Sequence, residues 1–382
     1  MFLDVTLQRN PALVDTAVEL HAGGQIPPDT YLLDLDAITV NARSIAEAGK
    51  RYGVELWQVG KQFGRNPLVY AAIGAAIPRA AVIDTREIAP ILAAGVQLAN
   101  VGHLVQIPVR QLPTVLAHRP AHVTVIDEQN LRAVSDAAVQ VGITQNVLLR
   151  VTAAAEDLYP GQDGGFDPED VERMRDLGLP GIRIAGVTGF PCVLFDDASG
   201  VPRATATADR VLRAASVLED PVINLPSHTS AGSLELLSSL GATVGEPGHA
   251  LTGTTPEHAV NYELPEQPAI VYVSEVALGS PVAAVFGGGF YPRGHAEKAL
   301  IVDKAERKLV RLHKGSAENI DYYRRFDCPG TSPTVGSTAV MAFRTQLFVV
   351  RSLVAVVSGI STGHPEVLGL FDGQGRVVES GR

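Results

Sequence analysis

The stretch that decides the fold is Val54-Glu-Leu-Trp-Gln-Val-Gly-Lys-Gln-Phe-Gly-Arg-Asn-Pro67. Its first six residues are typical of a short strand, and the residues from Pro67 onward place apolar side chains at helical spacing. Lys61 stands between them, where the strand ends and a loop begins. A strand, a loop with a polar residue and a helix form one βα unit, so this stretch predicts an α/β fold.

The same alternation extends in both directions from this stretch. Strands are predicted at residues 31–36, 54–59, 80–83, 98–101, 122–126, 147–151, 182–188 and 222–225, each followed by a helical pattern, and a separate helix is predicted at 11–22. Eight such units predict a closed parallel (β/α)8 barrel of the TIM type. An open doubly wound sheet has a similar pattern and stays open as an alternative.

From Pro265 the pattern changes to short β-branched runs that are broken by Gly and Pro. We therefore expect residues 1–260 to form the barrel with an N-terminal helical extension, and residues 261–382 to form a C-terminal β-rich domain. The most apolar late stretch, 347–360, contains Arg351 and is shorter than the ~20 residues of a membrane helix, so a strand is expected there.

Composition narrows the class of partner. The chain has 382 residues, of which 46% are hydrophobic and 19% charged, and its net charge is −10. No dense run of Lys and Arg offers the attraction that nucleic acids require, which favours small-molecule partners. Two cysteines, Cys192 and Cys328, define no disulfide framework, and Asp4 stands where a secretory signal would be basic. These features predict a cytoplasmic protein with no membrane association.

Lys61 is the first candidate for chemistry. Functional groups of a barrel gather at the carboxyl ends of its strands, where a partly desolvated lysine has a lowered pKa and a reactive neutral amine. Such an amine attacks aldehydes. A surface lysine in a loop is the alternative.

Two later turns have the composition of a phosphate site. Residues 222–233 end a strand in small hydroxyl residues, including Ser230, and open a helix whose free N–H groups can hold a phosphate. Residues 242–253 supply Gly248, where the backbone can approach a ligand closely, beside the carboxylate of Glu246.

Taken together, these residues resemble the alanine racemase N-terminal family, which are pyridoxal 5'-phosphate (PLP) enzymes of fold type III. The likeness covers about residues 28 to 255. It is carried by residues 32–37, the Lys61 strand, the helix at 87–95 and the turns at Ser230 and Gly248. Residues 59–67, 99–108 and 287–295 are similar to the bacterial YhfX-type subgroup.

The resemblance implies roles for individual residues. It makes Lys61 the lysine that forms a Schiff base with PLP, and makes Ser230, Gly248 and the N–H of His249 the phosphate-binding positions. Glu246 stands where alanine racemases have an arginine against the pyridine nitrogen. A carboxylate there would keep that nitrogen protonated and strengthen the ring as an electron sink. A turn residue facing solvent is the other interpretation of Glu246.

Two further residues have open roles. The strand end at 186–191 lacks the histidine that many family members stack on the cofactor, and His103 is a candidate to replace it. His103 is equally interpretable as a hydrogen-bonded core or loop residue. Arg150 ends another strand and is a candidate for binding a substrate carboxylate, or for pairing with a structural acid.

A racemase needs a second acid or base on the face opposite Lys61. The family takes it from the C-terminal domain of a partner subunit, so the resemblance implies a homodimer. Tyr291 and Cys328 are the candidates; each is also interpretable as a packing residue. The resemblance therefore predicts a PLP-dependent amino-acid racemase. A PLP-dependent lyase or decarboxylase is the alternative, because Glu246 suits other carbanion chemistry. A third interpretation is a PLP-binding protein that acts in cofactor homeostasis without a defined reaction. Small proteins of that kind lack a C-terminal β domain, so the domain expected here favours an enzyme.

Overall fold

The computed structural model describes residues 2–279, 281–289, 291, 294–316, 318, 320–328, 330 and 333–380. Contacts between Cα atoms divide the chain into two compact units. The barrel unit comprises Ala42–Gly60 and Ile73–Gly248, and the β unit comprises Met1–Asn41, Lys61–Ala72 and His249–Arg382.

The barrel unit is built on one parallel sheet of eight strands. In spatial order these are β2 (Glu55–Leu56), β11 (Val244–Gly245), β10 (Val222–Asn224), β7 (Ile182–Thr188), β6 (Gln145–Arg150), β5 (His122–Val125), β4 (Gln97–Val101) and β3 (Arg79–Val82). Gln58, which follows β2, bridges to Ala80 of β3 and so joins the two edges of the sheet. The predicted (β/α)8 barrel is confirmed.

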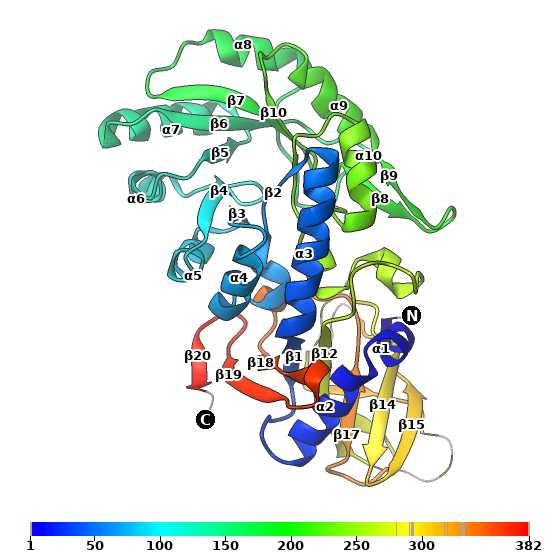
Figure 1. Ribbon diagram of the computed structural model, residues 1–382. Coiled ribbons are helices and arrows are strands. Elements are labelled where there is room, and N and C mark those ends of the chain that lie inside the picture. The colour runs from blue at the N-terminus through cyan, green and yellow to red at the C-terminus, as the bar shows by residue number, and fades with distance from the viewer. Residues whose placement is uncertain are drawn as a thin grey trace. The chain divides into compact units, whose positions relative to one another are not determined.

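Helices cover the outside of the strands (Figure 1). They are α5 (Ile88–Ala93), α6 (Leu112–Ala117), α7 (Glu128–Val141), α8 (Val171–Asp176), α9 (Ala206–Ala215) and α10 (Leu234–Ser239). Local sequence sets their ends: Asp127 accepts a hydrogen bond from the Asn130 N–H and begins α7, which Gly142 ends in a left-handed conformation. A hairpin of β8 (Val193–Asp196) and β9 (Val201–Ala204) lies in the chain between β7 and α9.

The barrel interior is filled by apolar side chains from several strands. Buried residues Trp57, Ala81, Ala99, Leu148 and Val244 belong to one hydrophobic cluster. Because side chains alternate along a strand, Arg150, two residues after Leu148 in β6, points to the same face as Leu148 and lies nearer the carboxyl ends of the strands. This alternation positions the candidate site described below.

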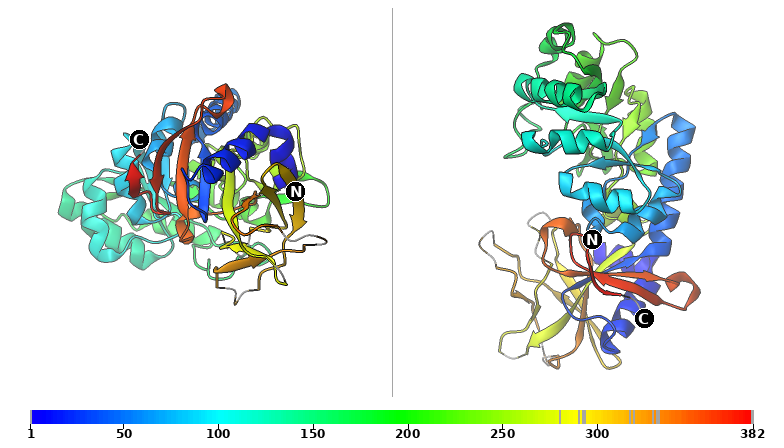
Figure 2. Two further views of the ribbon diagram at one scale, coloured as in Figure 1. Left: turned by 90° about the horizontal axis from the view of Figure 1, so that it is seen from below. Right: turned by 90° about the vertical axis from the view of Figure 1, so that its left-hand side faces the viewer.

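The β unit has a mixed ten-stranded sheet. Its main order is β15 (Glu306–Arg311), β14 (Lys298–Asp303), β17 (Thr338–Met341), β12 (Ile270–Leu278), β1 (Thr30–Asp34), β18 (Leu353–Ser358), β19 (Glu366–Phe371) and β20 (Val377–Ser380), while β13 (Ala284–Phe286) pairs with β12 and β16 (Tyr323–Arg325). The helices α1 (Phe2–Arg9) and α2 (Pro11–Ala22) lie beside this sheet in Figure 2. Leu13 and Ala17 of α2 share a buried core with Val273, Val340 and Ala355. The long helix α3 (Leu35–Tyr52) and α4 (Pro67–Gly74) complete the described α-helices.

Two expectations about strands are wrong. Residues 31–36 do not form a barrel strand, because β1 pairs antiparallel with β12 and parallel with β18 in the β unit. A central strand that is buried on both faces has the same apolar sequence in either sheet, so local pattern could not distinguish them. The eighth barrel strand is instead the two-residue β11. Residues 347–360 are also not one strand, because a 3₁₀ turn at Leu347–Val349 precedes β18.

The domain boundary that the sequence places near residue 260 stays a prediction. Among the described helices, none combines the length and the hydrophobicity needed to cross a membrane.

Candidate functional site

Polar residues form a row at the carboxyl ends of three adjacent barrel strands. Arg150 ends β6, Thr188 ends β7 and Asn224 ends β10. The register pairs Arg150 with Thr188 and Thr188 with Asn224, so the three side chains lie at one level on the same face of the sheet. Leu148 and Val222, two residues earlier, belong to the interior cluster. The row therefore faces the barrel interior directly above the apolar core.

This row contains polar atoms that no described residue satisfies. Arg150 is 2% exposed, and Thr188 and Asn224 are fully buried. Arg150 Nε, Thr188 Oγ1 and Asn224 Oδ1 have no hydrogen-bond partner among the described residues. Buried polar atoms without partners are costly, each by about 1–3 kcal/mol, unless a ligand or water supplies the bond. A polar ligand at the carboxyl ends of the strands would remove that cost.

Glu246 adds a buried carboxylate to this end of the barrel. It follows β11 and is 6% exposed, which excludes the solvent-facing interpretation. Asn224 Nδ2 donates to Glu246 Oε1 at 2.7 Å, and the Glu246 N–H donates to Thr229 Oγ1 at 3.0 Å. The Asn224 amide and the Thr229 hydroxyl thus hold the position of Glu246 from two sides.

His103 lies beside Glu246. It follows β4, is 1% exposed, and its Nε2 is 3.9 Å from Glu246 Oε2. Its ring meets Phe190 edge to face, with centroids 6.1 Å apart. The structure therefore brings His103 and Glu246 together. From the sequence, His103 was a candidate to stack on the cofactor and Glu246 a candidate partner of its pyridine nitrogen.

Arg150 Nη2 donates to the Gln162 carbonyl at 2.9 Å. No carboxylate lies within ion-pair distance of its guanidinium in the described part of the chain, so the interpretation as the partner of a structural acid is not supported. Burial lowers the pKa of the Arg150 guanidinium, and the nearby Cys192 opposes this. An arginine keeps its charge even so, because its ordinary pKa is above 12.

Cys192 is fully buried near the same groups. Burial raises the pKa of its thiol, and the Glu246 carboxylate raises it further. The thiol is therefore protonated at neutral pH and is a poor nucleophile.

The Ser230 turn is held by its own side chains. Ser230 is fully buried and begins a 3₁₀ turn at Ala231–Ser233 that leads into α10. The Ser230 N–H donates to Ser233 Oγ at 2.9 Å, and Ser233 Oγ donates to the His228 carbonyl at 2.6 Å. Gly248, the other expected phosphate position, is buried in the same unit.

Lys61 and His249 belong to the β unit. Lys61 is partly buried in a 3₁₀ turn at Gly60–Phe63, two residues after Val59, whose N–H donates to the Pro247 carbonyl at 3.0 Å. His249 begins a 3₁₀ turn at His249–Thr252. Arg344 Nε donates to His249 Nε2 at 3.2 Å, while His249 Nδ1 lies 3.0 Å from Thr254 Oγ1. These contacts assign the ring proton of His249 to Nδ1.

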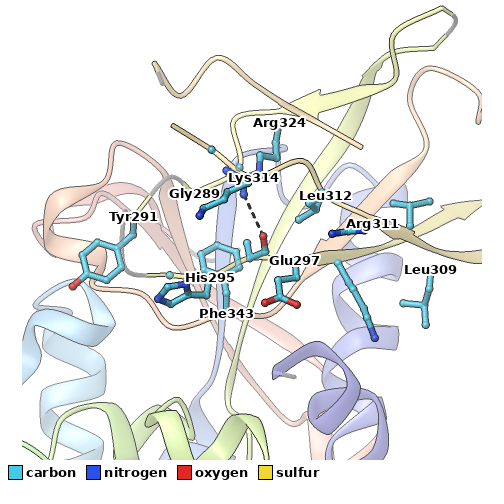
Figure 3. Close-up of a pocket in the computed structure, with 16 residues that line it drawn as sticks. Gly289, Tyr291, His295, Glu297, Leu309, Arg311, Leu312, Lys314, Arg324 and Phe343 are labelled. Atoms are coloured by element: carbon cyan, nitrogen blue, oxygen red, sulfur yellow. Dashed lines mark hydrogen bonds between the residues drawn. The ribbon is translucent and has the colours of Figure 1, made fainter. Parts of the chain in front are cut away.

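Tyr291 and Cys328 are both partly buried in the β unit but line different pockets. Tyr291 lines a pocket of about 720 Å³, at one end of which its ring lies with the hydroxyl directed away from the other labelled residues (Figure 3). Cys328 lines a smaller pocket with His313 and Asp327, whose Nε2 and Oδ1 are 2.8 Å apart. The structure does not bring the two candidates together.

Sequence reasoning missed Thr188, Asn224 and Arg344. The signal for the first two was present: each is the last residue of a predicted barrel strand or the residue before its end, and each is polar. Arg344 had no such signal, because only the folded chain brings it to His249.

The sequence of this chain matches two family models. The model described as "Alanine racemase, N-terminal domain" matches residues 33–256. The model described as "YhfX-like, C-terminal domain" matches residues 271–367. The protein YhfX of Escherichia coli (strain K12) is 37% identical over 388 residues, which cover 98% of this chain and 99% of that protein.

Solved structures show the same fold at low identity. D-threonine aldolase from Filomicrobium marinum is similar with a TM-score of 0.68 and 18% identity, covering 91% of this chain and 94% of that chain. Alanine racemase from Clostridium difficile 630 in complex with cycloserine has a TM-score of 0.63 and 16% identity, covering 91% and 99%. Diaminopimelate decarboxylase from Helicobacter pylori has a TM-score of 0.65 and 13% identity, covering 88% and 92%.

Proposed function

Because this chain belongs to the alanine racemase N-terminal domain family, we propose that it is a PLP-dependent enzyme acting as an amino-acid racemase. The observation that carries the proposal is the row of buried, unsatisfied polar atoms on Arg150, Thr188 and Asn224 beside the buried Glu246 carboxylate. A polar, ring-shaped cofactor with several acceptors and donors fits such a lining.

Each candidate residue has a part in this proposal. The backbone at Ser230, Gly248 and His249 would hold the phosphate, and the Glu246 carboxylate would favour the protonated form of the pyridine nitrogen. Asn224 orients Glu246, and His103 packs beside the ring. When bound, PLP supplies an aldehyde for Lys61 and a ring that withdraws electrons from the substrate's α-carbon.

The chain's own residues then move the protons. Lys61 removes the α-proton from one face, and a second group returns a proton to the other face. Tyr291 and Cys328 remain the candidates for that group. Arg150 binds the substrate carboxylate through its buried guanidinium. The active form is a homodimer, as the family likeness implies, and light scattering on catalytically active protein tests that assembly.

A lyase or decarboxylase reaction on the same cofactor is the second candidate. Glu246 favours it, since a protonated ring stabilises carbanions formed by loss of groups other than hydrogen. Incubating the holoenzyme with a panel of amino acids in deuterated water separates the two. α-Hydrogen exchange with inversion supports racemisation, whereas loss of carboxylate or side chain supports the alternative.

The Lys61 assignment has a direct test. Purified protein should be yellow, and borohydride should remove the visible absorbance and leave a pyridoxyl group that peptide mapping finds on Lys61. Lys61→Ala should abolish the absorbance, whereas Lys50→Ala, which changes an exposed lysine of α3, should keep it. A pyridoxyl group on another lysine contradicts the assignment.

A further inference from the structure

The pocket of about 720 Å³ lies wholly within residues of the β unit and is rich in basic side chains. Its charged lining consists of Lys298, Arg311, Lys314 and Arg324 against one carboxylate, Glu297. This excess of positive charge contrasts with the net charge of −10 of the chain. The local potential in the pocket therefore attracts anions, although the protein as a whole repels them.

Most of that positive charge has no ion-pair partner among the described residues. Lys298 is the exception, because its Nζ lies 2.9 Å from Asp4 Oδ2. In the described part of the chain, no carboxylate comes within ion-pair distance of Arg311, Lys314 or Arg324. Three cations are thus available to a ligand.

Arg324 is held in place by its surroundings. Its Nη2 donates to the Ala296 carbonyl at 3.2 Å, the dashed line in Figure 3. Its stem packs on Gly288, where an added Cβ would come within 2.9 Å of Arg324 Cβ. Because the side chain is already ordered, binding a ligand costs little additional conformational entropy.

Arg324 also has an unmet hydrogen bond. Its Nε is buried and has no acceptor among the described residues. Burial lowers the pKa of its guanidinium, although Asp321 opposes this. A partly desolvated cation with an unpaired donor gains most from an anion that accepts two parallel hydrogen bonds.

Gly288 and Gly289 line one side of the pocket, and each is hydrogen-bonded to a tyrosine. Tyr31 Oη donates to the Gly289 carbonyl at 3.0 Å, and the Gly288 N–H donates to Tyr272 Oη at 3.0 Å. Tyr272 Oη in turn donates to Asp29 Oδ1 at 2.7 Å. The wall is therefore pre-formed in the absence of a ligand.

Apolar side chains complete the pocket. Leu309, Leu312 and Phe343 line it together with the basic residues, and Figure 3 shows Phe343 and Leu312 among the labelled side chains. A pocket with apolar walls and a few polar groups that converge is typical of small-molecule sites. A bare inorganic ion would leave these walls in contact with water.

We propose that this pocket binds a small organic anion, with a carboxylate or phosphate held by Arg324 and Lys314 and an apolar portion against Leu309, Leu312 and Phe343. Tyr291, a candidate acid or base of the proposed reaction, also lines this pocket, but anion binding by Arg324 and Lys314 does not require that reaction. Arg324 donates from Nε to one oxygen of the anion, and Lys314 supplies a second charge.

Calorimetry on the full-length protein as purified tests this with three probes of similar size: benzoate, phenyl phosphate and benzyl alcohol. The two anions should bind, with affinity that falls as salt increases, and the neutral alcohol should bind at least ten-fold more weakly. Equal affinity for benzyl alcohol would overturn the proposal.

Variants locate the binding. Arg324→Gln should weaken binding of both anions about ten-fold or more, and Lys314→Gln about three-fold, as expected for loss of one charge-assisted bond and of one exposed charge. Arg325→Gln is the matched control: it is the next residue on β16, it is exposed, and it lines the smaller pocket. The idea is wrong if Arg325→Gln weakens binding as much as Arg324→Gln, or if neither Arg324→Gln nor Lys314→Gln has an effect.

A second readout needs no variant. Lys314 is exposed, so acetylation by a water-soluble reagent can be followed at this residue by mass spectrometry. Phenyl phosphate should slow acetylation of Lys314 and leave Lys304, an exposed turn lysine outside the pocket, unchanged. Equal rates at Lys314 with and without phenyl phosphate would contradict the assignment.

Discussion

At the scale of single residues, the proposed role of Glu246 makes the sharpest chemical prediction. Its carboxylate is buried and accepts a hydrogen bond from Asn224, so its position does not depend on a ligand. A fixed carboxylate beside a protonatable ring nitrogen makes the nitrogen more basic, because the charged pair stabilises the protonated form. Asn224 donates to Glu246, so in the proposed function it would be a positioning residue.

Glu246→Gln should slow α-hydrogen exchange by roughly two orders of magnitude, on the rule of ~1.4 kcal/mol per factor of ten. Glutamine keeps an oxygen that can accept from Asn224 Nδ2, so the fold and the PLP content should be unchanged. Exchange in deuterated water measures the rate, and visible absorbance measures the bound cofactor.

Glu235→Gln, which changes an exposed carboxylate on α10, serves as the control and should exchange at the wild-type rate. Unchanged exchange in Glu246→Gln would show that the carboxylate does not act on the ring. Loss of PLP would show instead that Glu246 is needed for binding.

At the scale of elements, the loop between β13 and β14 depends on glycine. Gly287, Gly288 and Gly289 all have positive φ, at 55°, 144° and 54°. A Cβ on Gly289 would overlap the Tyr31 hydroxyl, and one on Gly287 would come within 2.5 Å of the Tyr272 hydroxyl. The loop therefore needs glycine both for its backbone conformation and for space.

Gly289→Ala should lower the free energy of unfolding by about 2–5 kcal/mol, which combines the cost of a left-handed alanine with that of overpacking. Gly363→Ala separates the two causes, because Gly363 has a φ of 75° and open space around it. We expect only about 1–2 kcal/mol there. Urea unfolding of both variants measures the difference, and equal losses would mean that the tyrosine contact is unimportant.

At the scale of the whole molecule, we expect one buried and one half-buried histidine to make stability depend on pH. Burial lowers the pKa of His21 in α2 and of His122 in β5, against the opposing effect of Glu275 and of the Ala99 carbonyl respectively. In the unfolded chain both histidines titrate near about 6.5. The unfolded state therefore binds more protons below that value, and stability is lost as the pH falls from there toward the lowered folded pKa.

His122→Phe should reduce this acid sensitivity. His122 stacks on Trp57 with centroids 5.4 Å apart, and phenylalanine keeps a stacked ring without a titrating group. Trp57 is the single tryptophan of the chain, so its fluorescence follows unfolding of the barrel. Between about pH 7.5 and pH 5.5, His122→Phe should lose less stability than the wild type.

The exposed His118→Gln is the control for this comparison. It should show the same loss of stability on acidification as the wild type. If His122→Phe behaves like the control, acid sensitivity has another source.

Much of the fold and part of the candidate site followed from the sequence by itself. Periodicity identified the βα units, because alternation and helical spacing are local properties of the chain. Lys61 and Arg150 were proposed from their places at the ends of predicted barrel strands, whereas Ser230 and Glu246 were proposed from the composition of two later turns. The roles assigned to these residues remain predictions.

Only the tertiary structure decided which strands share a sheet and which side chains meet. Residues 30–34 have the pattern of a barrel strand but pair with β12 and β18, since pairing depends on distant segments. The contact between Asn224 and Glu246 spans 22 residues, and Arg324 reaches the Ala296 carbonyl across 28. Local sequence sets the conformation of each segment, whereas the free energy of burying its apolar face against remote segments sets its neighbours.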